Sequence, residues 1–317
     1  MKKIVRGLAT VGMVFLLGGA AFALEGYAGK IETFERPGLT VHTYNSVEGM
    51  LDGSAIFETE KELVLLEPQS MPESAKELKR YIDGLDKPLA AVIVSYHGAG
   101  LAPYKGIPIY ASKAATEFAG DGRGAALFEN FAKGVPGFDP TVIVPDHVLE
   151  GPNASIGGID FALEYDDIPA PAPGMVIAVP SAKVVYLHML GGDTHSILGS
   201  AGHIDAFAEQ LRKMKGEGYE LILTSHHTPE KPEALDAKIA YLEKTKDILS
   251  ASKTKEDFVA AMKEAFPDYQ GEGYLEMSAA NLYNSPGFRA DRISSKSNEN
   301  EREGPRLKLR YGPSQLF

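Results

Sequence analysis

Apolar and polar positions alternate along the first part of the chain in the pattern of β-strands. Three runs of this kind predict strands at 40–43, 54–59 and 63–67. A capping-box spacing that begins at Ser70 and an apolar stripe through Leu78 and Ile82 then predict a helix. The chain therefore opens with a strand-rich segment followed by one amphipathic helix.

The uninterrupted apolar run 89–94 predicts a buried strand, and its carboxyl end leads directly into the loop 95–101. Proteins of the α/β class place much of their chemistry at such strand ends. A strand at 107–110 and a helix at 113–118 follow. Five glycines lie within 120–137, and they predict a mobile, irregular excursion.

The second half of the chain repeats this strand-rich organisation. Its apolar runs predict strands at 141–144, 159–164, 175–179, 184–187 and 220–223. A stripe through Ile204, Phe207 and Leu211 predicts an amphipathic helix over 201–215. Two more helices are predicted at 234–251 and 254–265.

Composition and charge exclude some classes of partner and chemistry. The chain has 317 residues, 44% of them hydrophobic, which is enough for one large domain, predicted at 24–284. The formal net charge of −11 repels phosphate backbones, so we expect no nucleic-acid partner. Cysteine is absent, which excludes disulfides and thiolate metal ligands. No exposed apolar stripe stands out in the sequence, so the sequence does not predict an oligomeric state.

The two ends of the chain differ from this body. Residues 1–23 have the pattern of a signal peptide: three of the first six residues are basic, an uncharged apolar stretch follows, and Ala21-Phe22-Ala23 matches an A-x-A cleavage site. The apolar stretch is shorter than the ~20 residues of a spanning helix, so we expect a periplasmic or secreted protein with no stable membrane anchor. The polar segment 285–317 predicts a disordered tail.

Four segments at predicted strand ends contain the candidate chemistry: Leu63 to Pro68, Val92 to Leu101, Val184 to Asp193 and Leu221 to Pro229. In order and spacing they resemble the strand ends of the metallo-β-lactamase superfamily, which finish in Asp-x-Gly, Thr-His-x-His-x-Asp-His, Gly-Asp and Gly-His-x-Pro. The resemblance covers residues 30–284. It implies an α/β (α+β) fold, a four-layer αββα sandwich of two mixed β-sheets with the site along one edge.

Enzymes of that superfamily use one or two metal ions to hold a hydroxide that attacks an acyl, thioester or phosphoryl centre. Carried over position by position, the ligands of the histidine-rich motif fall on Tyr96, Gly98, Gly100 and Leu101. Glycine and leucine have no lone pair to donate, and tyrosine would have to ionise. The resemblance retains only Asp193 and His226, so we expect no standard dinuclear zinc site.

A rearranged mononuclear site remains possible chemically. Asp193, His226 and either His97 or His195 offer the donor types that zinc, iron or manganese accept. The alternative is that these histidines only hydrogen-bond to loop backbone in a polar crevice. The residues expected to line that crevice are Tyr96, Gly98, Gly100 and His227. His188, at the end of an apolar strand, is interpreted as a buried and satisfied structural histidine.

Two functions stay open at this point. One is an exported protein that binds a small-molecule ligand, or an unidentified protein partner, in the former active-site crevice. The other is a divergent metal-dependent hydrolase of an ester, thioester, lactam or phosphoester. Serine-esterase and zincin chemistry are excluded, because the chain has neither a Gly-x-Ser-x-Gly nor a His-Glu-x-x-His motif. The sequence does not identify the substrate.

Overall fold

The first sheet contains eight strands, which lie in the same order in the sheet as in the sequence. The computed structural model describes residues 21–22, 26–48, 51–165, 174–188 and 191–284. The strands are β1 (Ala21–Phe22), β2 (Lys30–Arg36), β3 (Leu39–Asn45), β4 (Gly53–Glu58), β5 (Leu63–Leu66), β6 (Leu89–Val94), β7 (Ile109–Ser112) and β8 (His147–Leu149). Pairing is antiparallel from β1 to β5 and parallel from β5 to β8. The carboxyl ends of β5 and β6 therefore lie side by side.

The second sheet has five strands in the order β13, β12, β11, β10 and β9. They are β9 (Asn153–Ile156), β10 (Ile159–Tyr165), β11 (Met175–Val179), β12 (Val184–Leu187) and β13 (Leu221–Thr224). Only the pair β12 and β13 is parallel, so the loops after these two strands leave the sheet at the same edge. Short 3-10 turns, η1 (Ala102–Tyr104) and η2 (Pro180–Ala182), complete the connections.

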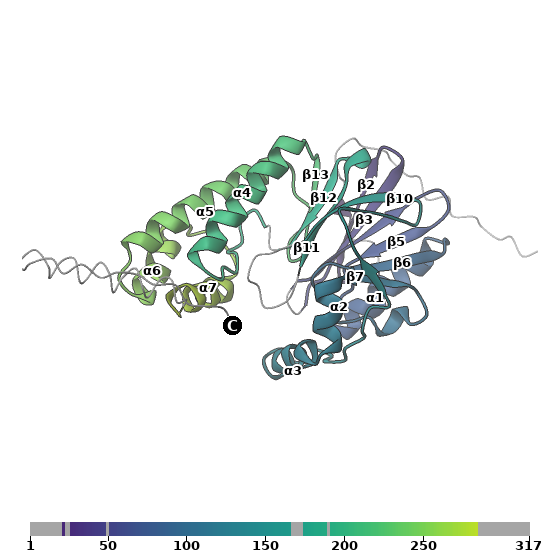
Figure 1. Cartoon of the computed structure of the whole chain (residues 1–317), viewed down its shortest axis with the longest axis horizontal. Coiled ribbons are helices and arrows are strands. Elements are labelled where there is room, and N and C mark those ends of the chain that lie inside the picture. The colour runs from purple at the N-terminus through teal and green to yellow at the C-terminus, as the bar shows by residue number, and fades with distance from the viewer. Residues whose placement is uncertain (1–20, 23–25, 49–50, 166–173, 189–190, 285–317) are drawn as a thin grey trace, which may run out of the picture.

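Helices cover the outer face of each sheet (Figure 1). Helices α1 (Pro72–Gly84), α2 (Lys113–Gly120) and α3 (Arg123–Gly134) lie on the side of the first sheet. Helices α4 (Ala201–Glu217), α5 (Glu233–Ala251), α6 (Lys255–Ala265) and α7 (Glu272–Asn284) lie on the side of the second. None of the helices within the described ranges is long and apolar enough to cross a bilayer.

The three largest apolar clusters among the described residues hold these layers together. One lies between the two sheets and includes Phe57 and Phe161, whose rings meet edge to face at 5.6 Å. A second packs Leu78 and Ile82 of α1 against the first sheet, and a third packs α4 to α7 against the second sheet. The predicted four-layer αββα sandwich of two mixed sheets is confirmed.

Helix α1 begins differently from the prediction. Its N-cap is Met71, which makes no side-chain cap, and the capping box expected at Ser70 is not formed. The Glu48 carboxylate replaces it: Oε1 accepts the Ser74 backbone N–H at 3.0 Å and the Ser74 hydroxyl at 2.7 Å. A residue distant in sequence therefore satisfies the free amide of the first turn.

Two predictions for the middle of the chain are wrong. Much of the glycine-rich stretch 120–137 is the regular helix α3, because the glycines bracket a run of good helix formers and Gly122 supplies the left-handed N-cap at φ +91°. Residues 141–144 form no strand, and β8 follows at 147–149 instead. Pro140 and Pro145 flank that apolar run, and proline cannot donate to a strand ladder.

The predicted domain limits fall largely on residues that are not described. Of the proposed signal peptide, residues 21 and 22 are described, and they form β1. The predicted tail, 285–317, lies outside the described residues. The cleavage and the disorder of these ends remain predictions.

Candidate metal centre

A buried carboxylate shapes the loop that follows β6. Glu67, at the end of β5, is fully buried at φ +58°. Its Oε1 accepts the backbone N–H groups of Ser95 and Tyr96, the latter at 2.9 Å, and its Oε2 accepts the N–H of His97 at 2.7 Å. Three amides of the loop thus converge on one carboxylate, which fixes the direction in which His97 leaves the backbone.

The His97 side chain is buried against the same carboxylate. Its Nδ1 lies 2.9 Å from Glu67 Oε2, although the contact does not have hydrogen-bond geometry. Burial opposes the charged imidazole, but Glu67 outweighs it and raises the pKa of His97 above its ordinary value. The loop closes tightly, because a Cβ on Gly100 at φ +74° would meet the Gln69 carbonyl oxygen at 1.8 Å.

His226 follows β13 and has an equivalent carboxylate behind it. Its Nδ1 lies 3.3 Å from Oδ1 of Asp52, a residue that is 1% exposed. Burial opposes the ionised form of Asp52, yet His226 and His97 together hold its pKa well below the usual range. The sequence analysis did not identify Asp52, because it precedes β4 and no motif surrounds it.

His188 follows β12 and completes the group. Its ring stacks on Tyr96, with centroids 3.6 Å apart. Its Nε2 is buried and has no hydrogen-bond partner, so the interpretation of His188 as a satisfied structural histidine is wrong. Burial, followed by His97 and His226, lowers the pKa of His188 well below its ordinary value. His188 is therefore neutral, the form in which imidazole binds a metal.

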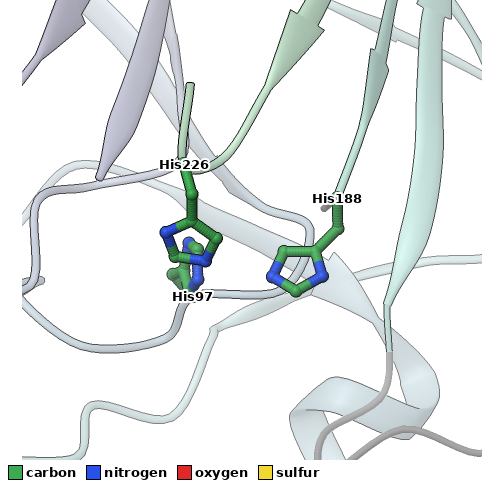
Figure 2. A group of neighbouring side chains, drawn as sticks. All are labelled: His97, His188 and His226. Atoms are coloured by element: carbon green, nitrogen blue, oxygen red, sulfur yellow. The ribbon is translucent and has the colours of Figure 1, made fainter. Parts of the chain in front are cut away.

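The three imidazole rings lie next to one another (Figure 2). One ring nitrogen from each of His97, His188 and His226 lies within 4.8 Å of the other two. A tetrahedral zinc ion with bonds of about 2.0–2.1 Å needs nitrogens about 3.4 Å apart, so small side-chain rotations would bring these donors into range. The strand ends of β6, β12 and β13 place them there.

The donor set fits one divalent metal ion. Metal-binding histidines commonly have a carboxylate behind the second ring nitrogen, as Glu67 and Asp52 lie behind Nδ1 of His97 and His226. The unpartnered Nε2 of His188 is the kind of buried polar atom that such an ion would satisfy. Zinc, iron and manganese all accept imidazole ligands.

Comparison with known proteins gives a consistent result at the level of fold. No family model and no curated protein matches the sequence. Among solved structures, a metallo-β-lactamase from Erythrobacter litoralis with β-mercaptoethanol in its active site aligns over 71% of this chain and 100% of its own, with TM-score 0.51 and 15% identity. The metallo-β-lactamase DIM-1 aligns over 69% and 98%, with TM-score 0.51 and 13% identity.

The chain has the metallo-β-lactamase fold. A double mutant of the sec-alkyl sulfatase PisA1 also aligns, over 84% of this chain and 54% of its own, with TM-score 0.53 and 16% identity. At these identities the likeness describes the fold alone. Which side chains could bind a metal ion in this metallo-β-lactamase-fold chain depends on its own residues.

Asp193, expected as a metal ligand with His226, pairs with a different histidine. Its Oδ1 lies 3.1 Å from Nε2 of His227, and its side chain is 54% exposed. His227 Nδ1 lies 2.9 Å from Glu230, whose hydrogen bond is the main reason that the pKa of His227 rises to about 9. Asp193 thus belongs to a separate group with His227 and Glu230, outside the three-histidine cluster.

His195, the other alternative ligand, belongs to the helical layer. Its Nδ1 lies 3.1 Å from the Tyr241 hydroxyl, and its ring packs against Tyr269. Burial, followed by the charge of Lys238, lowers the pKa of His195 to about 4. The sequence analysis gave His195 as an alternative to His97 in the rearranged site, but the structure buries its side chain, 1% exposed, in the helical layer.

The three histidines line one end of a cavity of about 120 Å³. Of the predicted crevice residues, Tyr96 and Gly98 line this cavity. Gly100 backs onto Gln69, and His227 faces Asp193 instead. Two of the four residues expected to line the crevice therefore lie on the cavity wall.

Proposed function

We propose that this metallo-β-lactamase-fold chain binds a small-molecule ligand in the cavity next to His97, His188 and His226, and that these imidazoles hold one divalent metal ion. The observation that supports the proposal is the convergence of three ring nitrogens within 4.8 Å beside that cavity. One of them, on His188, is buried without a partner. A bound metal would supply a Lewis acid for an oxygen of the ligand.

The residues around the three-histidine cluster hold its side chains in place and orient them. Glu67 and Asp52 position His97 and His226 from behind, and Tyr96 stacks on His188 from the side. Among the cavity-lining residues that the structure describes, none has a carboxylate side chain. We therefore favour binding over hydrolysis, because no carboxylate among the described lining residues could act as a general base toward a water molecule in the cavity.

Hydrolysis is the second candidate, and one observation favours it. Three protein ligands and an open fourth position are the usual complement of a catalytic zinc site, and the cluster provides three histidines. The substrate classes are those that the resemblance to the superfamily implies: an ester, a thioester, a lactam or a phosphoester. This candidate requires turnover that depends on the same three side chains.

Metal content measured by mass spectrometry on untagged protein tests both candidates. We expect one ion per chain after exposure to micromolar zinc, iron or manganese. The ion should be lost in His188→Ala and retained in His147→Ala, which removes a histidine from the exposed edge strand β8. Asp193→Asn should also retain it, because Asp193 pairs with His227.

A chain that stays metal-free under these conditions, or that binds two ions, contradicts the metal proposal. Turnover of ester, thioester, lactam and phosphoester probes is measured on the same samples. Activity that disappears together with the metal in His188→Ala favours the hydrolase. Stoichiometric metal without turnover favours a binding protein.

We also propose export to the periplasm or the medium, supported by the basic start, the apolar stretch and the A-x-A site of residues 1–23. N-terminal sequencing of the protein recovered after expression of the full chain tests this. A mature protein that begins at Leu24 is expected. Full-length protein retained with the cytoplasmic fraction contradicts it.

A further inference from the structure

Helices α2 and α3 present apolar side chains on the wall of the cavity, and Phe128 and Phe131 of α3 also pack against the ring of Phe138. No residue of α2 is buried, and Gly124 is the only buried residue of α3. Phe118 of α2 and Leu127, Phe128 and Phe131 of α3 are partly exposed and line the cavity. Two short helices thus keep four large apolar side chains partly exposed on the cavity wall, and two of them pack against the small apolar cluster of Met71, Ala99 and Phe138.

The opposite wall is also apolar. Ile197 and, from α7, Met277 line it, and Met277 is 42% exposed. Tyr274 of α7 lies next to the histidines, with its ring centroid 6.1 Å from that of His226. Among the described lining residues none is aspartate, glutamate, lysine or arginine. Apart from Ser70, the polar lining side chains are the three histidines with Tyr96 and Tyr274 beside them, so they form one polar end of the cavity. The cavity therefore has an apolar body and a single polar end.

This polarity constrains the ligand. The polar end presents imidazoles, and the carboxylates Asp52 and Glu67 are buried behind them. An oxygen-bearing anionic head complements imidazoles, or a metal ion that they hold, whereas a cationic head has no partner there. The volume of about 120 Å³ is slightly smaller than that of an apolar cavity of about 150 Å³ that holds a benzene ring.

We propose that the cavity binds an amphiphilic carboxylate with an apolar group of about five or six carbon atoms, the apolar group lying between α2, α3 and α7 and the carboxylate at the three histidines. The inference rests on the proposed function for the polar end. The apolar walls support it independently. Each buried methylene should strengthen binding about fourfold until the cavity is full.

Calorimetric titration of the zinc-loaded full chain with acetate, butanoate, hexanoate, octanoate and decanoate tests this. Affinity should rise about fourfold per methylene and level off near hexanoate. A flat series, or no binding of any chain length while one zinc ion is bound, overturns the inference and leaves the metal proposal standing. A rising series on a chain that binds no zinc supports the apolar site and contradicts the metal proposal.

Two variants move the plateau in opposite directions. Ala119→Phe fills the cavity from α2, so the affinity for hexanoate should fall tenfold or more while the affinity for acetate is unchanged. Phe128→Ala enlarges it, and the plateau should move to octanoate or beyond. Ala114→Phe is the matched control, because Ala114 lies on the exposed side of the same helix. Equal effects of Ala119→Phe and Ala114→Phe, or an unmoved plateau in Phe128→Ala, overturn the assignment.

Discussion

Glu67 should contribute to stability far more than an ordinary surface carboxylate, and Glu67→Gln tests this. The substitution keeps the size and removes the charge. One oxygen of glutamine can still accept the N–H groups of Ser95 and Tyr96. The amide NH₂ would then face the backbone N–H of His97, which Glu67 Oε2 now accepts at 2.7 Å. A buried donor would lose its acceptor.

The magnitude follows from this hydrogen-bond count. An unsatisfied buried N–H costs about 1–3 kcal/mol, and two bonds that change from charged to neutral acceptors each lose about 1 kcal/mol. Relief from burying the charge offsets part of this loss. We therefore expect the free energy of unfolding to fall by about 3 kcal/mol. The corresponding fall in Tm is about 6–12 °C for a domain of this size.

Urea unfolding followed by circular dichroism measures the change, with Glu209→Gln as the control. Glu209 lies on the surface of α4 with a side chain that is 79% exposed, so its substitution should cost less than about 0.5 kcal/mol. If the free energies of unfolding of Glu67→Gln and Glu209→Gln differ by less than about 0.5 kcal/mol, the Glu67 carboxylate does not organise the loop after β6. Zinc affinity should fall about 10–100-fold in Glu67→Gln, because His97 loses its orienting partner.

Two further predictions concern the buried Lys238 and Gly100 in the loop after β6. Burial lowers the pKa of Lys238 to about 7, so above pH 7 the folded state binds fewer protons than the unfolded state. The stability of the wild type relative to Lys238→Met should therefore rise by up to about 1.4 kcal/mol per pH unit between pH 7 and 9.5, and a flat difference in urea unfolding would refute the shift. Gly100→Ala should destabilise by more than about 3 kcal/mol, because its Cβ would lie 1.8 Å from the Gln69 carbonyl oxygen at φ +74°. Gly216→Ala, in α4 with nothing within 4 Å, should stabilise by about 0.5 kcal/mol, and similar Tm values for the two variants would contradict this contrast.

Local patterns predicted most elements because burial on one face imposes a period on the sequence. The stripe through Ile204, Phe207 and Leu211 corresponds to α4, and the run 89–94 to β6. The same patterns failed where apolar side chains serve another purpose. The residues of 141–144 include Ile143, which packs against the first-sheet core from a loop. Helix α3 has no stripe of buried apolar residues, because its large apolar side chains line the cavity. Its glycines made the helical pattern still harder to see.

The candidate site was predictable only in part. His97 and His226 could be selected from the sequence because they directly follow apolar strands. His188 has the same position after β12, but an isolated histidine at a strand end is indistinguishable from a core residue until its neighbours are known. Asp193 was favoured by the family resemblance, and His195 was an alternative to His97. The turns after β12 direct them to His227 and to Tyr241.

The sequence by itself determined the alternation of strands and helices, the absence of thiolate chemistry and the loss of donors at Gly98, Gly100 and Leu101, because these depend on residue type and local period. The tertiary structure alone decided which histidines meet. Three strand ends that are distant in sequence converge at one edge of the sandwich, where Glu67 and Asp52 lie behind His97 and His226 and Tyr96 stacks on His188. That convergence is a property of sheet pairing, which no local pattern contains.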